Sequence, residues 1–201
     1  MLTASYYSSA NKEELLRLLG QFSEIEELNK NPFLSYSWQY SWVSSLPTSL
    51  PTLVTFKNGG MVVGYTLYKT KEIFPGLPIY CGFLNQIGNS TYDQVWIEFN
   101  DIICKKGFEH QCIELLISQV LKKENVAKFT LSMCKDPKAW IQAAQHNNYQ
   151  YQIDHTPGFR KPLANINCVK DVLIGLSRNS RYKMNRAIRD AETTFGQLSV
   201  K

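Results

Sequence analysis

Hydrophobic and polar residues along the first third of the chain follow strand-like and helix-like periods in turn. Residues 2–7 have the composition of a short strand. A helix then follows, with Ser9 or Asn11 as alternative N-caps, because leucines recur on one face up to Ile25. After the pair Asn31 and Pro32, a second helix rich in Trp and Tyr is predicted to end near Pro47.

The clearest turn signal in the chain lies between two runs of strand-forming residues. Residues 53–56 and 61–68 are rich in Val, Leu, Thr and aromatic side chains, and they flank the sequence KNGG at residues 57–60. Asn-Gly and Gly-Gly pairs favour the positive φ angles of a tight two-residue turn. This pattern predicts a β-hairpin.

The rest of the chain predicts strands and helices in mixed order. Strands are expected at 79–83 and 126–133, and residues 149–153 and 159–166 are expected to give one or two more. Helices are expected at 96–104, 108–121, 137–146 with Trp140 inward, 169–176, and again from a cap at Ser180. Such an order favours an α/β fold with a mixed sheet and helices on both faces.

Composition allows a substantial hydrophobic core. With 201 residues, 44% of them hydrophobic, the chain can form one large domain, or one domain and the beginning of another. Residues 31–56 and 73–92 are uncharged, but their prolines and polar residues argue for buried structure rather than a membrane span. The N-terminus lacks the pattern of a secretory signal.

The cysteines and histidines indicate reduced thiols and no metal site. Five scattered cysteines without a C-x-x-C pair are typical of a cytoplasmic protein, and the three histidines match no zinc motif. No Ser/His/Asp or Cys/His arrangement supports nucleophilic catalysis.

The net charge of +5 is concentrated near the C-terminus. Residues 178–189 hold five basic side chains and no acidic one. On a helical wheel, the arginines occupy one arc, and Met184, Ala187, Ile188, Ala191 and Phe195 occupy another. The basic arc is either a solvated face or a surface for a small anion or a lipid headgroup; without other basic patches, nucleic acid is not expected.

Several segments together resemble one family. LSRNSRYKMNRAIR (176–189), followed by GQLSV (196–200), resembles the inter-domain helix and next strand of CelD-like proteins. These are GNAT-type acyltransferases, related in architecture to FemAB-like peptidyl transferases. NPFLSYSW (31–38), KNGG (57–60) and YDQVWIEFN (92–100) are similar to the upstream landmarks, in the same order.

The resemblance implies two lobes in a protein about twice as long. Residues 1–168 would be the N-terminal GNAT-like lobe, 169–195 a helical connector between lobes, and 196–201 the start of a second lobe. Acetyl-CoA or another acyl-CoA is expected mainly in that second lobe. The corresponding loop here, residues 105–110, has one glycine and the acidic Glu109, so we expect that this lobe alone does not transfer acyl groups.

Two groups of residues are candidates for substrate binding. Tyr92, Asp93, Trp96 and Glu98 could orient an amine or hydroxyl, although helix capping by Asp93 and core packing by Trp96 are alternatives. By the resemblance, Arg178, Arg181, Lys183 and Arg186 would face the cleft between lobes and meet cofactor phosphates or an anionic acceptor.

Two functions follow from these expectations. The first is the acceptor-side lobe of an acyl-CoA-dependent acyltransferase, whose partners are a small-molecule or peptide-like acceptor and its own C-terminal lobe. The second is a non-catalytic binding module whose basic helix docks on an anionic partner or a membrane surface. The acceptor, the acyl chain length and the oligomeric state do not follow from the sequence.

Overall fold

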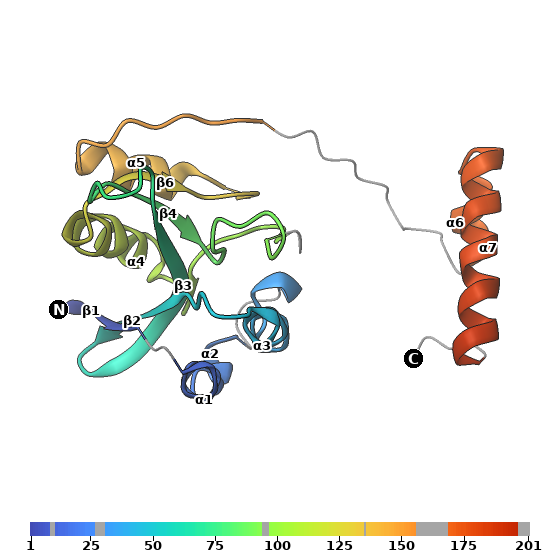
Figure 1. Ribbon diagram of the computed structural model, residues 1–201, viewed down its shortest axis with the longest axis horizontal. Helices are drawn as coiled ribbons and strands as arrows, with labels where there is room; N and C mark the ends of the chain where they lie inside the picture. Colours follow the sequence, from blue (N-terminus) through green and yellow to red (C-terminus); the bar gives the residue numbers. More distant parts are fainter. Residues whose placement is uncertain (9–10, 27–30, 94–96, 135, 156–168, 197–201) are drawn as a thin grey trace. The chain divides into compact units, whose positions relative to one another are not determined.

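The computed structural model describes residues 1–8, 11–26, 31–93, 97–134, 136–155 and 169–196 (Figure 1). The chain divides into two compact units, Met1–His155 and Thr156–Lys201, and each is described by itself. The predicted boundary at residue 168 lies outside the described residues, so the assignment of lobe, connector and second lobe stays a prediction. No helix among the described residues is long and apolar enough to cross a membrane.

The first unit is built on a six-stranded sheet with the order β1-β2-β3-β4-β6, in which β5 also pairs with β3. The β4–β6 pair is parallel and the other pairs are antiparallel. The strands are β1 (Leu2–Tyr7), β2 (Thr52–Asn58), β3 (Met61–Glu72), β4 (Tyr80–Leu84), β5 (Ile103–Cys104) and β6 (Val126–Thr130).

Helices cover both faces of this sheet (Figure 1). On one side lie α1 (Lys12–Gly20), α2 (Ser23–Glu26), the 3-10 helix η1 (Pro32–Leu34) and α3 (Tyr36–Ser45). On the other lie α4 (Glu109–Leu115), which continues as the π-helix η2 (Leu116–Leu121), and α5 (Lys138–His146). The predicted fold class, mixed α/β with helices on both faces, is confirmed.

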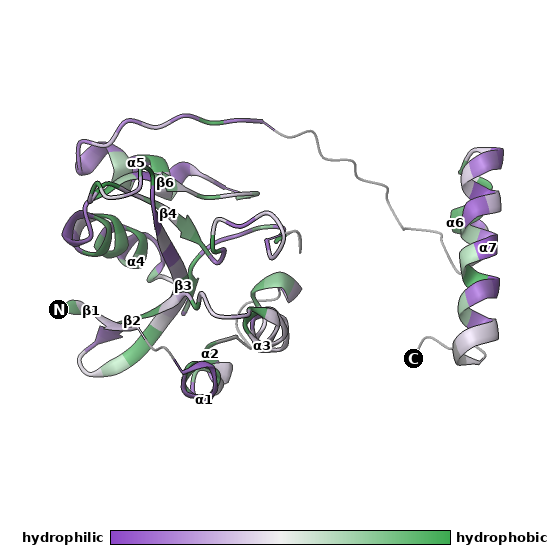
Figure 2. Ribbon diagram, in the orientation of Figure 1, coloured by the Kyte–Doolittle hydropathy of each residue, from purple (hydrophilic) through white to green (hydrophobic). Residues whose placement is uncertain are grey.

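The alternation of side chains along the strands produces two hydrophobic cores. In β2, Leu53 packs against α1 and α3, while Val54 and Phe56 pack against α4 and α5. In β3, Leu67 packs in the core with α1 and α3, and Tyr68 packs in the core with α4 and α5. Figure 2 shows hydrophobic residues concentrated in α4.

Local sequence signals explain several boundaries. Asn11, one of the two predicted caps, accepts a hydrogen bond at Oδ1 from the Glu13 backbone N–H (2.9 Å) and so caps α1. Gly59 and Gly60 have φ angles of +56° and +86°, as a tight turn with two positive φ values requires. The predicted β2–β3 hairpin is therefore confirmed.

Two predicted elements of the first unit are wrong. Within the segment predicted as a helix at 96–104, residues 97–102 are not helical and 103–104 form β5. Ile102 belongs to one core and Ile103 to the other, which is the two-residue period of a strand. Residues 149–153 form no strand, because they pair with no described strand, and Tyr151 is 51% exposed.

Other predicted boundaries need adjustment. Strand β6 ends at Thr130 rather than at residue 133, where Met133 has a φ of +55°. The strands predicted at 159–166 and after Gly196 lie outside the described residues.

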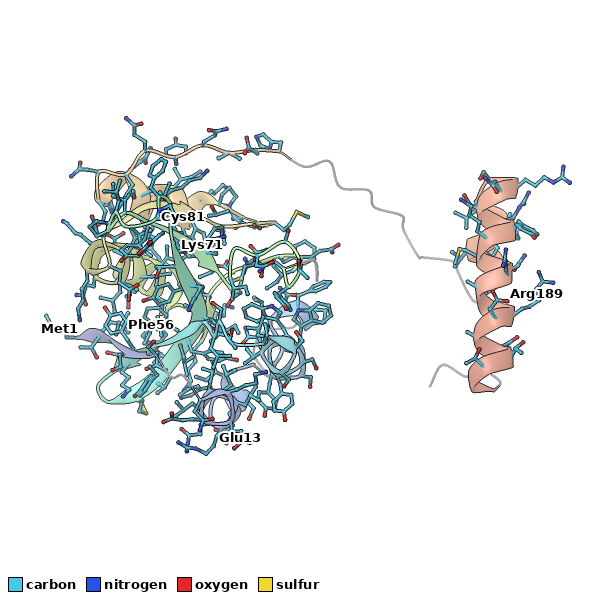
Figure 3. All side chains as sticks on the ribbon, in the orientation of Figure 1. Met1, Glu13, Phe56, Lys71, Cys81 and Arg189 are labelled. Carbon is cyan, nitrogen blue, oxygen red and sulfur yellow. The ribbon has the colours of Figure 1, made fainter. Side chains whose placement is uncertain are left out.

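The second unit contains α6 (Val169–Ile174) and α7 (Arg178–Phe195). Ser177, not Ser180, caps α7: its Oγ accepts a hydrogen bond from the Ser180 backbone N–H (3.2 Å). Ile188 and Ala191 are half-buried, while Arg189 extends away from the helix (Figure 3). The predicted apolar arc is only partly covered, because Met184 is 41% exposed and Ala187 is also exposed.

Candidate functional site

The strand next to β3 is split into two pieces. Strand β4 pairs with Tyr68–Glu72 of β3, and β5 pairs with Gly64 and Tyr65 of the same strand. Between the two pieces, the described residues 85–93 and 97–102 are not part of the sheet. The backbone of β3 at Thr66 and Leu67 therefore lies opposite the break.

Asn85 bridges this break with its side chain. Its Oδ1 accepts hydrogen bonds from the Leu67 backbone N–H (3.1 Å) and the Thr66 hydroxyl (3.3 Å). Its Nδ2 donates to Asn100 Oδ1 (2.8 Å) and to the Asp101 carbonyl (3.0 Å). Asn85 is 4% exposed and has a φ of +49°, a conformation that Asn tolerates better than most residues. The amide network thus fixes both ends of segment 85–102.

A second amide ties the same segment to the helical face. Asn31 Nδ2 donates to the carbonyls of Glu98 (3.1 Å) and Phe99 (2.9 Å). Its Oδ1 accepts from the Phe33 backbone N–H (3.0 Å) and caps η1. Segment 85–102 is therefore held against η1 and α3 as well as against the sheet.

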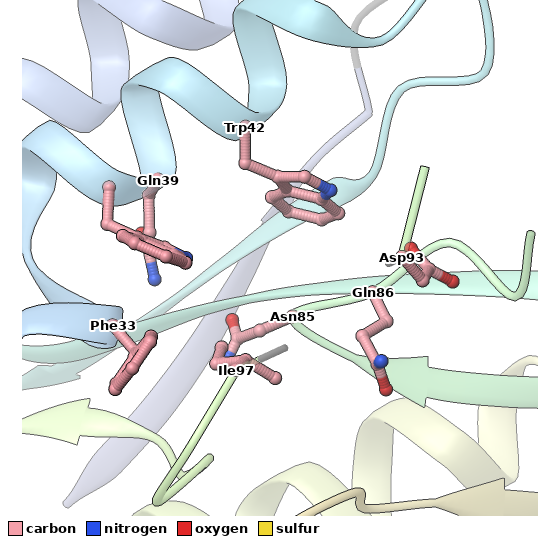
Figure 4. A pocket seen from close by; sticks show the side chains of 8 residues that line it. Phe33, Gln39, Trp42, Asn85, Gln86, Asp93 and Ile97 are labelled. Carbon is pink, nitrogen blue, oxygen red and sulfur yellow. The ribbon is translucent and has the colours of Figure 1, made fainter. Parts of the chain in front are cut away.

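A narrow pocket lies between α3 and this segment (Figure 4). Its volume is about 10 Å³, which is room for one group of the size of a water molecule. Aromatic rings form part of its wall, and Phe33 and Trp38 meet edge to face with centroids 4.8 Å apart. The lining residues are Phe33, Trp38, Gln39, Trp42, Asn85, Gln86, Asp93 and Ile97.

Gln39 is the unusual polar residue of this pocket. It is 1% exposed, and neither Nε2 nor Oε1 has a hydrogen-bond partner among the described residues. Gln39 lies on the buried face of α3 because Trp42 and Val43, three and four residues later, are buried on the same face. A buried amide without a partner costs about 1–3 kcal/mol, so it calls for a functional explanation.

The predicted acceptor residues do not all reach this pocket. Asp93 does: its Oδ1 accepts from the Ile87 backbone N–H (3.0 Å) and its Oδ2 from that of Asn89 (2.9 Å), while it lines the pocket wall. Asp93 therefore closes the loop at residues 87–93, and the residues that a helix cap at Asp93 would bind lie outside the described residues. Tyr92 packs against the core beneath α1 and α3, and Glu98 is exposed. Trp96 lies outside the described residues.

The predicted basic residues lie in the second unit. Arg178, Arg181, Lys183 and Arg186 are all exposed on α7. Arg186 Nε lies 3.6 Å from Asp190 Oδ2, an exposed pair one helical turn apart. Their place in a cleft between lobes stays a prediction.

The loop at 105–110 does not fit a pyrophosphate. Gly107 has a φ of +91°, and its backbone N–H donates to Glu109 Oε2 at 2.7 Å. Backbone N–H groups at the start of a helix are the donors that a phosphate would use. Here a carboxylate from the first residue of α4 occupies one of them, and its charge would repel a phosphate.

Raised pKa values make Cys104 and Cys134 poor nucleophiles. A hydrogen bond with Cys112, followed by burial, raises the pKa of Cys104, and burial raises that of Cys134 to about 11. Thiols with raised pKa values remain protonated near neutral pH. Among the residues that the structure describes, no cluster of three His, Cys, Asp or Glu side chains could hold a metal ion.

A second polar cluster lies at the other end of β3. The Tyr68 hydroxyl donates to Glu124 Oε1, and burial, followed by this hydrogen bond, raises the pKa of Tyr68. An open groove of about 440 Å³ next to it is lined by Thr70, Pro78, Tyr80, Lys123, Glu124 and Asn125. Both oxygens of Glu124 accept hydrogen bonds from Tyr68 and Thr70, so the carboxylate is already held within the fold.

Sequence reasoning missed the residue at the centre of the pocket. Gln39 was visible only as one polar position on the inner face of an aromatic helix, between Tyr36 and Trp42. The sequence places Asn85 in a polar run but gives no other indication that it belongs to the site. Asp93 was found because a carboxylate stood among aromatic residues in that run.

Comparison with known proteins gives structural neighbours only. No family model and no curated protein matches the chain. Several of the structural neighbours are described as acetyltransferases. A ribosomal-protein-alanine N-acetyltransferase from Brucella melitensis biovar Abortus 2308 is similar over 81% of this chain and 100% of its own, with 12% identity and a TM-score of 0.43.

Two further neighbours have similar values. An aminoglycoside acetyltransferase from an uncultured soil metagenomic sample, in complex with sisomicin, covers 80% of this chain and 97% of its own, with 10% identity and a TM-score of 0.43. A possible acetyltransferase from Clostridium difficile 630 has the same coverage and TM-score with 11% identity. Likeness at this level transfers no function, so function is argued below from the chain's own residues.

Proposed function

We propose that this chain is the N-terminal, acceptor-side lobe of an acyl-CoA-dependent GNAT-type acyltransferase of the CelD-like kind. The proposal rests on the sequence resemblance and on the mixed sheet, in which β4, one piece of the split strand, pairs in parallel with β6. The observation that carries the acceptor-side role is the buried, unpartnered amide of Gln39 in a pocket walled by aromatic rings.

The acceptor is proposed to bind at the pocket beneath α3. Gln39 would hydrogen-bond a polar group of the acceptor, and Asp93 at the same wall would help to orient it. Phe33 and Trp38, both half-buried, would exclude water around that group. Tyr92, Trp96 and Glu98 remain proposed neighbours of the acceptor.

The acyl-CoA is proposed to bind mainly in a second lobe. Glu109 makes loop 105–110 a poor place for the pyrophosphate, which supports this division. The basic face of α7, with Arg178, Arg181, Lys183 and Arg186, would then meet the cofactor phosphates or an anionic part of the acceptor. Acyl transfer to an amine or hydroxyl needs both lobes. The described cysteines are free thiols, which supports a reducing compartment such as the cytoplasm.

The test compares this chain with a longer protein that includes the next lobe, if the reading frame continues. Acetyl-CoA binding is measured by calorimetry, and transfer by mass spectrometry of acceptors. We expect binding and transfer only in the longer protein. If this chain alone binds acetyl-CoA, and the affinity is unchanged when Glu109 is replaced by Lys, the proposed division of acceptor and acyl-CoA between two lobes is contradicted.

The exposed basic helix favours a second candidate function. The arginines of α7 could dock a non-catalytic module on an anionic partner or membrane surface. Failure of the longer protein to bind acetyl-CoA, together with binding of this chain to vesicles that contain anionic phospholipid, would support that candidate instead.

A further inference from the structure

The hydrogen-bonding groups of Gln39 determine which chemical groups of a ligand can bind in the pocket beneath α3. Its Nε2 provides donors and its Oε1 provides an acceptor, and neither has a partner among the described residues. A ligand that satisfies both must itself donate and accept. Hydroxyl and carboxamide groups do both, whereas an ammonium group only donates and a carboxylate only accepts.

The size of the pocket selects between these two groups. A volume of about 10 Å³ admits one group of the size of a water molecule. A hydroxyl fills that space, while a carboxamide brings two further heavy atoms. A single hydroxyl oxygen can donate to Oε1 and accept from Nε2 of the same amide, because these two atoms lie on one carbon.

The charges around the pocket favour an uncharged ligand. None of the described residues that line it is basic, and the carboxylate of Asp93 would repel an anion. Both Asp93 oxygens already accept backbone hydrogen bonds from Ile87 and Asn89, which reduces what they can offer a cation. An ammonium group would also face the Nε2 donors of Gln39 and leave them unsatisfied.

The walls of the pocket favour a ring-shaped ligand. Phe33 and Trp38 are half-buried and Trp42 is 8% exposed, so aromatic surface runs from the exterior to Gln39. The C–H faces of a sugar ring are flat and apolar and pack well on indole and phenyl rings, while its hydroxyls point outward from the edge. Such a ligand would place one hydroxyl at Gln39 and its ring against the aromatic wall.

We infer, building on the proposed acceptor-binding function, that the pocket beneath α3 binds an uncharged saccharide, one hydroxyl of which enters and hydrogen-bonds both ends of the Gln39 amide. This hydroxyl is a recognition group, and the position that receives the acyl group lies elsewhere on the ligand. The acceptor class is therefore neutral sugars, not peptides or amines.

The test uses the full chain and a panel of small probes. Methyl glucoside, methyl galactoside, cellobiose and maltose represent neutral sugars, and glucosamine, glucuronate and N-methylacetamide represent ammonium, carboxylate and carboxamide groups. Binding is measured by ligand-observed NMR and calorimetry. We expect at least one neutral sugar to bind more tightly than any of the other three probes.

Variants then connect binding to the pocket. Gln39→Leu should weaken sugar binding at least tenfold while the melting temperature stays equal or rises, because an unsatisfied buried amide is removed. Trp38→Leu should also weaken binding and keeps the test valid if Gln39→Leu does not fold. Ser44→Ala, exposed on the same helix, should leave binding unchanged.

Three results would overturn the inference: no neutral sugar binds, Gln39→Leu and Trp38→Leu bind sugar like the unmodified chain, or a carboxamide or ammonium probe binds instead in a Gln39-dependent way.

The proposed function is tested separately from this inference. Sugar binding that depends on Gln39, without acyl transfer to any acceptor by the longer protein, would retain the inference and reject the acyltransferase. Acyl transfer by the longer protein to an acceptor that is not a sugar would retain the acyltransferase and reject the inference.

Discussion

Replacing Asn85 by Ala should be among the most damaging single changes in the first unit. It removes the side-chain hydrogen bonds to Thr66, Leu67, Asn100 and Asp101, and it leaves the Leu67 N–H and Asn100 Oδ1 buried without those partners. Each buried orphan costs about 1–3 kcal/mol, and Ala at positive φ costs about 1–2 kcal/mol more. We expect the free energy of unfolding to fall by about 3–8 kcal/mol.

Asn148 provides a matched control for the backbone part of this loss. It has a φ of +60° but is exposed. Asn148→Ala should therefore cost only the backbone term, about 1–2 kcal/mol. Urea denaturation followed by tryptophan fluorescence measures both variants. If Asn85→Ala costs within about 1 kcal/mol of Asn148→Ala, the bridging network does not hold the split strand as argued.

Two further predictions concern the hydroxyl of Tyr68 and the arginines of α7. Tyr68→Phe should lower the free energy of unfolding by about 1–2 kcal/mol at pH 7, because the hydrogen bond to Glu124 is lost. Since the pKa of Tyr68 is raised above its ordinary value of 10.0, the folded state holds the phenol proton more tightly than the unfolded chain, so stability should fall as pH rises above 10.0. Urea titrations from pH 7 upward should show a shallower fall in Tyr68→Phe, and equal slopes would refute this account. Replacing Arg181 and Arg186 together by Gln should weaken pyrophosphate binding, as measured by calorimetry. The free energy of unfolding should change by no more than about 0.5 kcal/mol, because both side chains are exposed. If circular dichroism shows that the helix of the variant is unfolded, these arginines are structural and not part of a binding surface.

The elements that the sequence predicted correctly are those with a strong local cause. Gly59 and Gly60 permit the turn of the β2–β3 hairpin through their own backbone freedom. The helices around Leu15 and Trp140 follow from a one-sided hydrophobic stripe, which local spacing alone defines. In these cases the tertiary structure agrees with the local preference.

The errors arise where distant contacts decide the local structure. The sequence predicts a helix at 96–104, but Ile102 and Ile103 pack in different cores and Asn100 hydrogen-bonds Asn85. The pocket was hidden for the same reason, since α3 and Asp93 are brought together only by packing. Asp93 was identified from its chemistry, whereas the need of Gln39 for a partner became visible only once its burial was known.

The division of one strand into β4 and β5 places core residues and pocket residues on the same stretch of chain. Ile87 and Ile97 pack in the core beneath α1 and α3, while Gln86 and Asp93 line the pocket. Related chains could acquire new ligands through changes at the pocket-lining positions, provided that Ile87 and Ile97 remain in the core.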